Sequence, residues 1–298
     1  MCRKNFIIVC AGSLGATGRS VGEPGMVTSL GFSNLSFDKS YFITITGRIG
    51  LHMSIELFHI HTWRCKHASE DSDRDYVSVA IEMGADKIVF TDHAPFPDNP
   101  FIGRMDMSQL PEYIESLSRL KEEMRGCIDV QIGLEVEYLP HYIKYYEYLS
   151  QIKELDCLLL GQHMYEIYPH RYNFDLEDKS MDYQKLGEMI VEGIESGLFS
   201  IVAHPDRIFK NAGVWNEKNN EISDKIITSA MRKKIPLEIN IKSVLKGQYR
   251  QEFWNLVPNE MINHAKRGLD AHSVKEMNEL NKLNHLLRFP MPETGFTP

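Results

Sequence analysis

The sequence predicts an α/β fold in which parallel strands are joined by crossover helices. From residue 55 onward, short apolar runs rich in β-branched residues alternate with longer amphipathic segments, and this alternation is typical of parallel sheets. Glycines stand just after three of the amphipathic segments, at Gly84, Gly126 and Gly197, where the C-terminal caps of helices are expected. On these grounds a barrel and a doubly wound sheet fit equally well.

Six segments have the composition of short buried strands. They lie at 56–61, 87–91, 130–136, 157–161, 200–204 and 236–241. Between them, apolar residues recur at three- and four-residue intervals, as at Leu117, Leu120 and Met124, which predicts helices. The predicted helices are 75–83, 108–125, 142–155, 182–196 and 222–233. The segment 261–267 lacks the β-branched residues of a last strand, so we expect a strand there to be short or irregular.

The composition is that of a globular protein and excludes several classes. Of the 298 residues, 43% are hydrophobic and 25% are charged, which rules out disordered, collagen-like and coiled-coil chains. The net charge of −8 argues against broad binding to nucleic acid or to an anionic membrane, because an acidic surface repels phosphate groups. No apolar run approaches the ~20 residues that span a bilayer. The five cysteines lack CxxC spacing, so we expect free thiols and a cytoplasmic location.

The first 52 residues differ in composition from the rest of the chain. They hold 8 Gly, 6 Ser and 4 Thr, so we expect a flexible leader at 1–52, the folded domain at 53–288 and a mobile tail at 289–298. The segment 12–20 resembles a phosphate-binding loop only faintly, since the required Gly and Lys are replaced. A secretory signal is also disfavoured, because the apolar run 6–9 is shorter than the roughly 7–15 residues that such a signal needs.

Histidines and carboxylates stand at or just beyond the ends of successive predicted strands. Functional groups of parallel sheets gather at these ends, and seven of the twelve histidines fall there. A single histidine usually has another role, but this many buried imidazoles and carboxylates without a metal would leave polar groups unsatisfied. Such ligands suit Zn, Mn or Fe, and their number indicates two to three divalent ions. The candidate ligands are His59, His61, His67, His93, Glu135, His163, His204, Asp270 and His272.

Five short motifs follow one another in an order that carries a family resemblance. They are HIH at 59–61, TDH at 91–93, GLEVE at 133–137, HPD at 204–206 and DAH at 270–272. Together they resemble the PHP (polymerase and histidinol phosphatase) superfamily of metal-dependent phosphoesterases, and most of all its histidinol-phosphatase branch. The resemblance covers roughly residues 55–275. It implies a distorted (β/α)7 TIM-like barrel of the PHP type, with a trinuclear site at its C-terminal face.

The resemblance also assigns each candidate ligand to an ion. It implies that Glu135 bridges the first and second ions, while Glu137 and Asp92 orient neighbouring groups instead of binding metal. The family usually has a serine where Leu269 stands, a change that does not touch the neighbouring ligands. The first ion would take His59, His61, Glu135 and Asp270, the second Glu135, His163 and His204, and the third His67, His93 and His272.

The expected function is that of a histidinol-phosphate phosphatase, which converts L-histidinol phosphate and water into L-histidinol and phosphate in histidine biosynthesis. A metal-bound hydroxide would attack phosphorus in line. Arg171, Arg207 and Lys242 are the cations expected to bind the small phosphorylated substrate, and Asp206 would either protonate the leaving alkoxide or cap the helix that follows it. The expected pocket walls are Tyr165, Tyr168 and Tyr172. Two alternatives stay open: a PHP phosphoesterase for another small phosphomonoester or nucleotide, and a non-catalytic interaction module.

A chain that begins at Met53 should fold and keep the full activity of the longer chain, because residues 1–52 are expected to contribute nothing to the barrel. Soluble yield, circular dichroism and phosphate release, measured side by side on both chains, check this prediction. Loss of solubility or of activity in the shorter chain would contradict the expected domain boundary.

Overall fold

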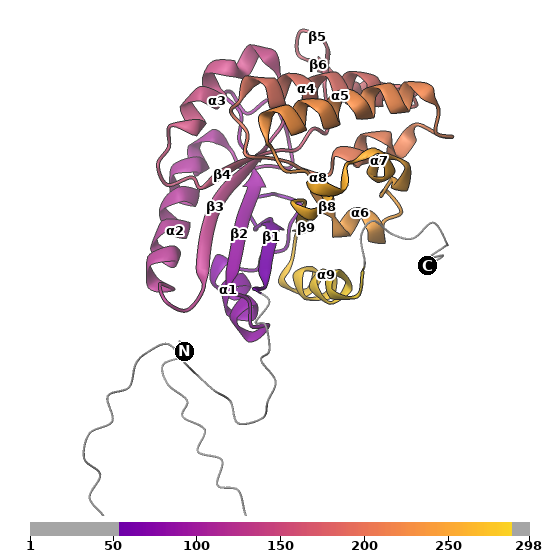
Figure 1. The fold of residues 1–298 in the computed structure, drawn as a ribbon. Coiled ribbons are helices and arrows are strands. Elements are labelled where there is room, and N and C mark those ends of the chain that lie inside the picture. Colours follow the sequence, from indigo (N-terminus) through magenta and orange to yellow (C-terminus); the bar gives the residue numbers. More distant parts are fainter. Residues whose placement is uncertain (1–53, 288–298) are drawn as a thin grey trace, which may run out of the picture. The chain divides into compact units, whose positions relative to one another are not determined.

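Seven parallel strands form the centre of the structure. The computed structural model describes residues 54–287, and the expected leader and tail lie outside these residues. The strands follow the order β7-β4-β3-β2-β1-β9-β8 in one sheet (Figure 1). Their bounds are β1 Glu56–Ile60, β2 Lys87–His93, β3 Asp129–Val136, β4 Cys157–Leu160, β7 Ile201–Val202, β8 Glu238–Asn240 and β9 Lys266–Ala271.

The two edge strands of this sheet, β7 and β8, approach each other and nearly close it into a barrel. Val202 in β7 forms an isolated parallel bridge with Leu237, and its amide donates to the carbonyl of Pro236 at 3.1 Å. Around this ring the strands occur in their chain order, as they do in a (β/α) barrel and not in a doubly wound sheet. The expected distorted (β/α)7 barrel is therefore confirmed.

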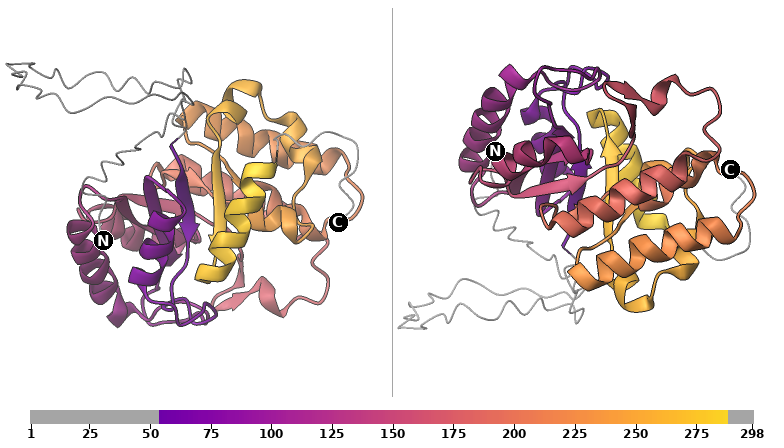
Figure 2. Two further views of the ribbon diagram at one scale, coloured as in Figure 1. Left: turned by 90° about the horizontal axis from the view of Figure 1, so that it is seen from below. Right: turned by 90° about the horizontal axis from the view of Figure 1, so that it is seen from above.

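Helices cover the outer face of the strands, as the two views of Figure 2 show. The main helices are α1 Asp73–Glu82, α2 Leu110–Glu123, α3 Ile143–Ser150, α4 Asp182–Ser196, α5 Glu217–Lys233 and α9 Val274–Leu286. Outward-facing strand residues such as Ile88, Phe90 and Leu134 belong to the large apolar core. None of the described helices has the length and apolar character needed to span a bilayer.

The inner face of the barrel carries a second, smaller apolar cluster. Its members are Phe58, Val89, Leu159, Ile201 and Ala203. Because side chains of a strand alternate between its faces, the inward positions after Val89 are Thr91 and His93, at the carboxyl end of β2. The interior of the barrel is therefore apolar away from the carboxyl ends of the strands and polar at those ends, as the strand-end motifs predict.

Several element bounds differ from the sequence-based expectation. α5 begins at Glu217, earlier than 222, because Asn216 caps it through a capping box with Asn219. β9 lies mostly beyond 261–267. The predicted helix 108–125 begins with a 3-10 turn, η1 Met107–Gln109. The elements that were not predicted are the hairpin β5 Glu166–Tyr168 and β6 Arg171–Tyr172, the α-helices α6 Ile241–Leu245, α7 Gln251–Leu256, α8 Asn259–Asn263 and α9 Val274–Leu286, and the 3-10 helices η2 Pro140–Tyr142, η3 Asn173–Asp175 and η4 Pro205–Asn211.

Two of the described cysteines, Cys65 and Cys157, are free thiols, as expected.

Gly268 in β9 leaves room for the carboxylate of Glu238, and replacing it should destabilise the barrel. A β-carbon at position 268 would lie 1.4 Å from Glu238 Oε1, whereas one at Gly84 would meet nothing within 4 Å. Gly268→Ala should lower the free energy of unfolding by about 3–5 kcal/mol, through overpacking and the loss of hydrogen bonds to a buried carboxylate. Urea denaturation measures this change.

Gly84→Ala is the matched control for this substitution. Its cost should be only about 1–2 kcal/mol, from a left-handed backbone that disfavours a β-carbon, because Gly84 has a φ of 77° and open space around it. Equal losses in the two variants would contradict the close approach of Gly268 to Glu238.

Candidate metal centre

The carboxylate of Glu135, near the end of β3, lies at the centre of a buried cluster of histidines. Glu135 is 1% exposed, and its two carboxylate oxygens face different imidazoles. Oε2 lies 3.5 Å from His59 Nε2, 3.5 Å from His61 Nε2 and 3.0 Å from His93 Nδ1, and Oε1 lies 2.9 Å from His204 Nε2 and 3.7 Å from His163 Nε2. A carboxylate shared in this way has the geometry of a bridge between two cations.

A second carboxylate, Asp270 of β9, also faces the cluster. Asp270 Oδ1 lies 3.6 Å from His61 Nε2 and 3.5 Å from His272 Nδ1. The His272 ring stacks on His61 with 4.2 Å between centroids, and its centroid lies 4.6 Å from that of His67. The structure therefore brings all the sequence-predicted ligands together at the carboxyl ends of the strands.

Three residues of the cluster have a left-handed backbone. φ is 67° at His59, 29° at His204 and 55° at Asp270, values that residues with a β-carbon rarely adopt. The pairing of β1 with β9 shifts register between Phe58 and Ile60, so a bulge re-aims the side chain of His59. Strain of this kind concentrates at functional sites, where the surrounding contacts hold it in place.

Two further buried carboxylates contact the outer nitrogens of the histidines. Glu238 Oε1 lies 2.6 Å from His59 Nδ1, while Glu238 Oε2 accepts the backbone amide of His204 at 2.8 Å. Glu137 Oε1 lies 3.1 Å from His163 Nδ1. Carboxylates in these positions fix the ring orientation and tautomer of a histidine that binds metal, which is the role expected of Glu137.

Sequence reasoning missed Glu238 and Arg104. A glutamate inside the apolar run 236–241 is a signal that could have identified Glu238, because a buried carboxylate is costly without partners. Arg104 stands in the loop after β2 with no comparable pattern around it. Its guanidinium donates to both oxygens of Glu137, at 2.8 and 3.1 Å.

Several nitrogens of the cluster are buried without a hydrogen-bond partner, and this fits a metal site. The unpartnered atoms are His59 Nε2, His61 Nε2, His93 Nδ1 and His272 Nε2. Buried polar atoms without partners are costly and rare, and divalent cations would satisfy these. The groups of three potential ligand atoms within 4.8 Å of one another are His59 with Glu135 and His204, His59 with His61 and Asp270, His67 with His93 and His272, His93 with Glu137 and His163, and His61 with Cys65 and His93.

Burial and mutual attraction set the protonation of the cluster. Burial lowers the pKa of His93 to about 3, and it lowers the pKa values of His204 and His272 to about 4. Burial alone would raise the pKa of Glu135, but the surrounding histidines hold it well below its ordinary value. His59 differs, because two carboxylates raise its pKa despite the opposing effect of burial. At His93, His204 and His272, neutral imidazoles therefore lie beside an ionised Glu135, and these are the states in which such groups bind metal.

A cavity of about 550 Å³ opens onto the cluster, and several basic side chains line it. The basic residues that line it are Arg104, Arg207, Lys242 and Lys246. Arg207 donates to Asp270 Oδ2 at 2.7 Å, and Lys242 donates to the carbonyl of Asp270 at 2.8 Å. Two of the three cations predicted to bind phosphate therefore lie beside the cluster.

The other predicted polar groups, Arg171 and Asp206, are not brought to this cavity. The β5–β6 hairpin carries Arg171 away, and its guanidinium pairs with Asp175 at 2.9 Å. Asp206 is buried, which raises its pKa to about 6, and its Oδ2 accepts the amide of Arg250 at 2.9 Å, at the start of α7. Asp206 thus contacts the start of α7 and not the helix that follows it, η4, whose N-cap has no side-chain hydrogen bond. The apolar residues lining the cavity are Ile102 and Phe174, in place of the predicted tyrosines.

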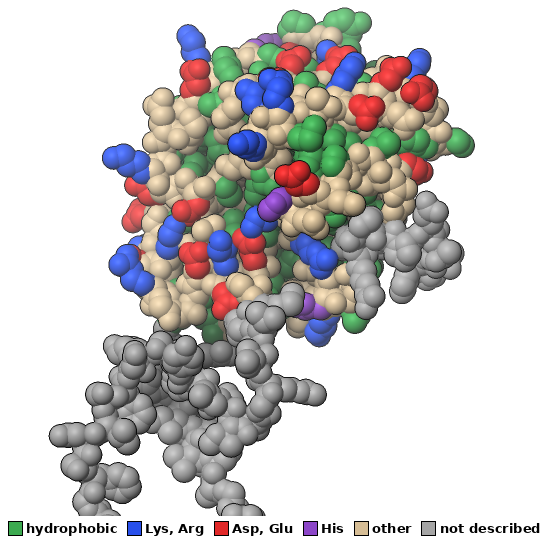
Figure 3. Space-filling view, viewed as in Figure 1, with side chains coloured by type: hydrophobic (Ala, Val, Ile, Leu, Met, Phe, Trp, Pro, Cys, Tyr) green, Lys and Arg blue, Asp and Glu red, His purple; other side chains and the backbone are tan. Residues whose placement is uncertain are grey.

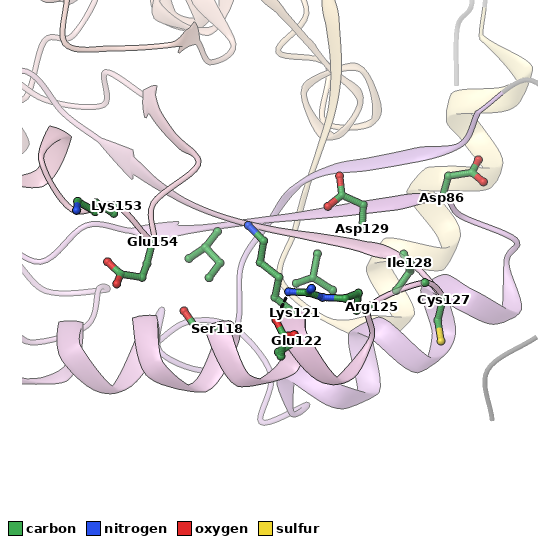
Figure 4. A pocket seen from close by; sticks show the side chains of 13 residues that line it. Asp86, Ser118, Lys121, Glu122, Arg125, Cys127, Ile128, Asp129, Lys153 and Glu154 are labelled. Carbon is green, nitrogen blue, oxygen red and sulfur yellow. Dashed lines mark hydrogen bonds and ion pairs between the residues drawn. The ribbon is translucent and has the colours of Figure 1, made fainter.

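A larger cavity, of about 690 Å³, lies at the opposite, amino ends of the strands (Figure 4). Asp129 at the start of β3 lines it together with Lys121 and Arg125 from the region of α2, and its lining contains no histidine. Lys121 pairs with Asp156 at 2.7 Å. On the face seen in Figure 3, acidic and basic side chains are likewise interspersed. The cavity at the amino ends therefore lacks the ligand chemistry of the histidine cluster.

Comparisons with known proteins identify the family of the chain. The sequence profile of the PHP domain matches residues 58–242. The chain belongs to the PHP domain family. Over 237 residues it is 37% identical to the histidinol-phosphatase of Lactococcus lactis. This match covers 73% of this chain and 84% of that protein. Over 160 residues it is 33% identical to the "Probable histidinol-phosphatase" of Deinococcus radiodurans, covering 50% of this chain and only 59% of that protein.

One solved PHP relative resembles the described barrel in fold. It is a histidinol phosphate phosphatase from Lactococcus lactis complexed with zinc, L-histidinol and phosphate. Its TM-score is 0.60 at 18% sequence identity, and the match covers 78% of this chain and 93% of that one. At this identity the likeness concerns the fold alone.

Proposed function

We propose that this PHP domain is a metal-dependent phosphomonoester hydrolase and that its substrate is L-histidinol phosphate, an intermediate of histidine biosynthesis. The observation that carries the proposal is the sharing of Glu135 between two groups of buried imidazoles, His59, His61 and His93 on one oxygen and His163 and His204 on the other. The names of the relatives from Lactococcus lactis and Deinococcus radiodurans support the choice of substrate.

The proposed centre holds two to three divalent ions, Zn, Mn or Fe. Two of the ligand groups, His59 with His61 and Asp270 and His67 with His93 and His272, support the first and third ions of the assignment made from the family resemblance. The distances of His163 and His204 from Glu135 Oε1 support the second. Ions held there would lower the pKa of a water molecule and offset the charge of a phosphoryl group. The proposed ligands are His59, His61, Glu135 and Asp270 for the first ion, with Glu135, His163 and His204 for the second and His67, His93 and His272 for the third.

The basic residues of the cavity would bind and orient the phosphate. Arg207 is the leading candidate, because its guanidinium lines the cavity while it contacts Asp270. A planar guanidinium suits phosphate oxygens, and its contacts with them are charge-assisted. Lys242 and Lys246 would add positive charge on the same wall. The free thiols of Cys65 and Cys157 support the further proposal of a cytoplasmic enzyme.

Phosphate release from L-histidinol phosphate tests the proposed function directly. The purified full chain should hydrolyse this substrate with a higher kcat/KM than a panel of other phosphomonoesters and nucleotides, and metal analysis of the same sample should find two to three equivalents. Chelation should abolish the activity and re-addition of metal should restore it. Preference for another phosphomonoester would assign a different substrate, and full activity in metal-free protein would overturn the mechanism.

Glu135→Gln should release metal and lower kcat by orders of magnitude. A neutral amide cannot offset the repulsion between two adjacent divalent cations as a carboxylate does. Glu188→Gln is the control, because Glu188 is an exposed residue of α4 that pairs with Lys185. Metal content and steady-state kinetics of both variants check the prediction. If Glu135→Gln keeps its metal and its rate, Glu135 is not the bridging ligand.

Arg207→Ala and Arg171→Ala should behave differently. Loss of a charge-assisted phosphate contact corresponds to about 1.4–3.5 kcal/mol, so kcat/KM of Arg207→Ala should fall by roughly tenfold to a few hundredfold. Arg171→Ala should match the parent protein, because Arg171 pairs with Asp175 on the exposed hairpin. Metal content is measured alongside the kinetics. Metal loss in Arg207→Ala would mean that Arg207 acts by holding Asp270, and equal kinetics in both variants would place the phosphate contact elsewhere.

A further inference from the structure

Cys65 is a buried thiol next to Nδ1 of His61, the ring nitrogen that points away from the carboxylates of the cluster. It is 0% exposed, and its sulfur lies 3.4 Å from His61 Nδ1 and 3.1 Å from Asp92 Oδ1. The sulfur also accepts the backbone amide of His93 at 3.1 Å. Two motifs of the sequence, at 59–61 and 91–93, therefore meet at the sulfur of Cys65.

We propose that Cys65 is a positioning residue that holds His61 in the tautomer with hydrogen on Nδ1, which leaves Nε2 free to bind a cation, and that Asp92 enables this by taking the thiol hydrogen. The proposal rests on the metal centre of the proposed function, but not on the identity of the substrate.

The hydrogen count around the sulfur supports this assignment. A thiol has one hydrogen, and it can go to Asp92 Oδ1 or to His61 Nδ1. Hydrogen bonds to a carboxylate are stronger than those to a neutral acceptor, so the thiol hydrogen goes to Asp92. The sulfur is then an acceptor toward His61, and Nδ1 of that ring must supply the hydrogen.

The surroundings of the other ring nitrogen favour the same tautomer. His61 Nε2 has no hydrogen-bond partner, and it lies 3.5 Å from Glu135 Oε2 and 3.6 Å from Asp270 Oδ1. These separations are too long for good N–H···O hydrogen bonds, which span roughly 2.7–3.2 Å. A lone pair that faces two carboxylate oxygens across such gaps is arranged to bind a cation between them.

A thiol has a particular advantage at this position. His59 and His163 have carboxylates behind their rings, Glu238 and Glu137, whereas His61 already has Asp92 nearby, on the far side of the sulfur. A third carboxylate at position 65 would stand against Asp92 in a buried environment, where like charges repel strongly. A neutral thiol fixes the ring without adding negative charge.

Nitrogen-15 NMR of the histidine rings in the metal-free full chain tests the proposal without any activity measurement. His61 of the parent protein should show a protonated Nδ1 and an unprotonated Nε2. Cys65→Ser, which keeps an acceptor and a donor, should preserve this pattern, and Cys65→Ala should shift His61 toward the other tautomer or a mixture. A parent protein with hydrogen on Nε2, or a Cys65→Ala variant with the parent pattern, would overturn the proposal.

Zinc affinity, measured by competition with a chelator, provides a second readout. Loss of a group that orients a ligand typically weakens metal binding by about 10- to 100-fold, so Cys65→Ala should fall in this range and Cys65→Ser should stay near the parent value. Cys157→Ala is the control, because Cys157 is a second free thiol among the described residues and lies in β4 outside the cluster. Parent-like affinity in Cys65→Ala would contradict the proposal.

Two further points keep the test decisive. If Cys65→Ala fails to fold, Cys65→Val takes its place, since valine fills the space of the thiol and accepts no hydrogen bond. The tautomer of His61 in the parent protein is informative whatever the variants do. A chain with the expected tautomer that binds zinc but does not hydrolyse L-histidinol phosphate would disprove the proposed substrate and leave the role of Cys65 standing.

Discussion

The buried negative charge of Glu135 is the constraint on which the rest of the site depends. β3 has β2 and β4 as its neighbours in the sheet, so a carboxylate at its carboxyl end reaches imidazoles from both halves of the ring. Space for it comes from Gly161 after β4, where a β-carbon would lie 2.1 Å from Glu135 Oε1. Without this anion, the neutral rings around it would have no central counter-charge to hold cations close together. The glycine therefore leaves space for the carboxylate of Glu135, the strand order places it between two halves of the ring, and the histidines surround it.

The positions of the candidate ligands could be predicted from the sequence because they depend mainly on the backbone. Parallel strands bring their carboxyl ends to one edge, so a histidine that ends a strand, such as His93, reaches the site whatever its neighbours are. Arg171 and Asp206 depend on the direction of irregular segments instead. Arg171 lies on a hairpin with no clear sequence signal, and the 3-10 helix η4 directs Asp206 toward α7.

The last strand shows the limit of composition as a guide. β9 has the sequence KRGLDA, which contains no β-branched residue. It forms a strand because β1 and β8 pair with it on both sides, and β-propensity reflects such surroundings more than an intrinsic backbone preference. Gly268 within it is required for a reason that a single sequence does not reveal, namely the side chain of Glu238 on the neighbouring strand.

Glu238 has a consequence for the barrel as a whole. Main-chain pairing between β7 and β8 is reduced to the bridge of Val202 with Leu237, and just beyond it the Glu238 side chain accepts the amide of His204 at 2.8 Å. A side-chain hydrogen bond thus joins β7 to β8 beyond the point where their backbone hydrogen bonds end. The same carboxylate contacts His59 on the opposite side. Separation of β7 from β8 would break the contact of Glu238 with His204 and leave Glu238 beside His59, because β8 stays joined to β1 through β9. Opening of the barrel at this edge would therefore detach one histidine of the candidate metal centre from the others.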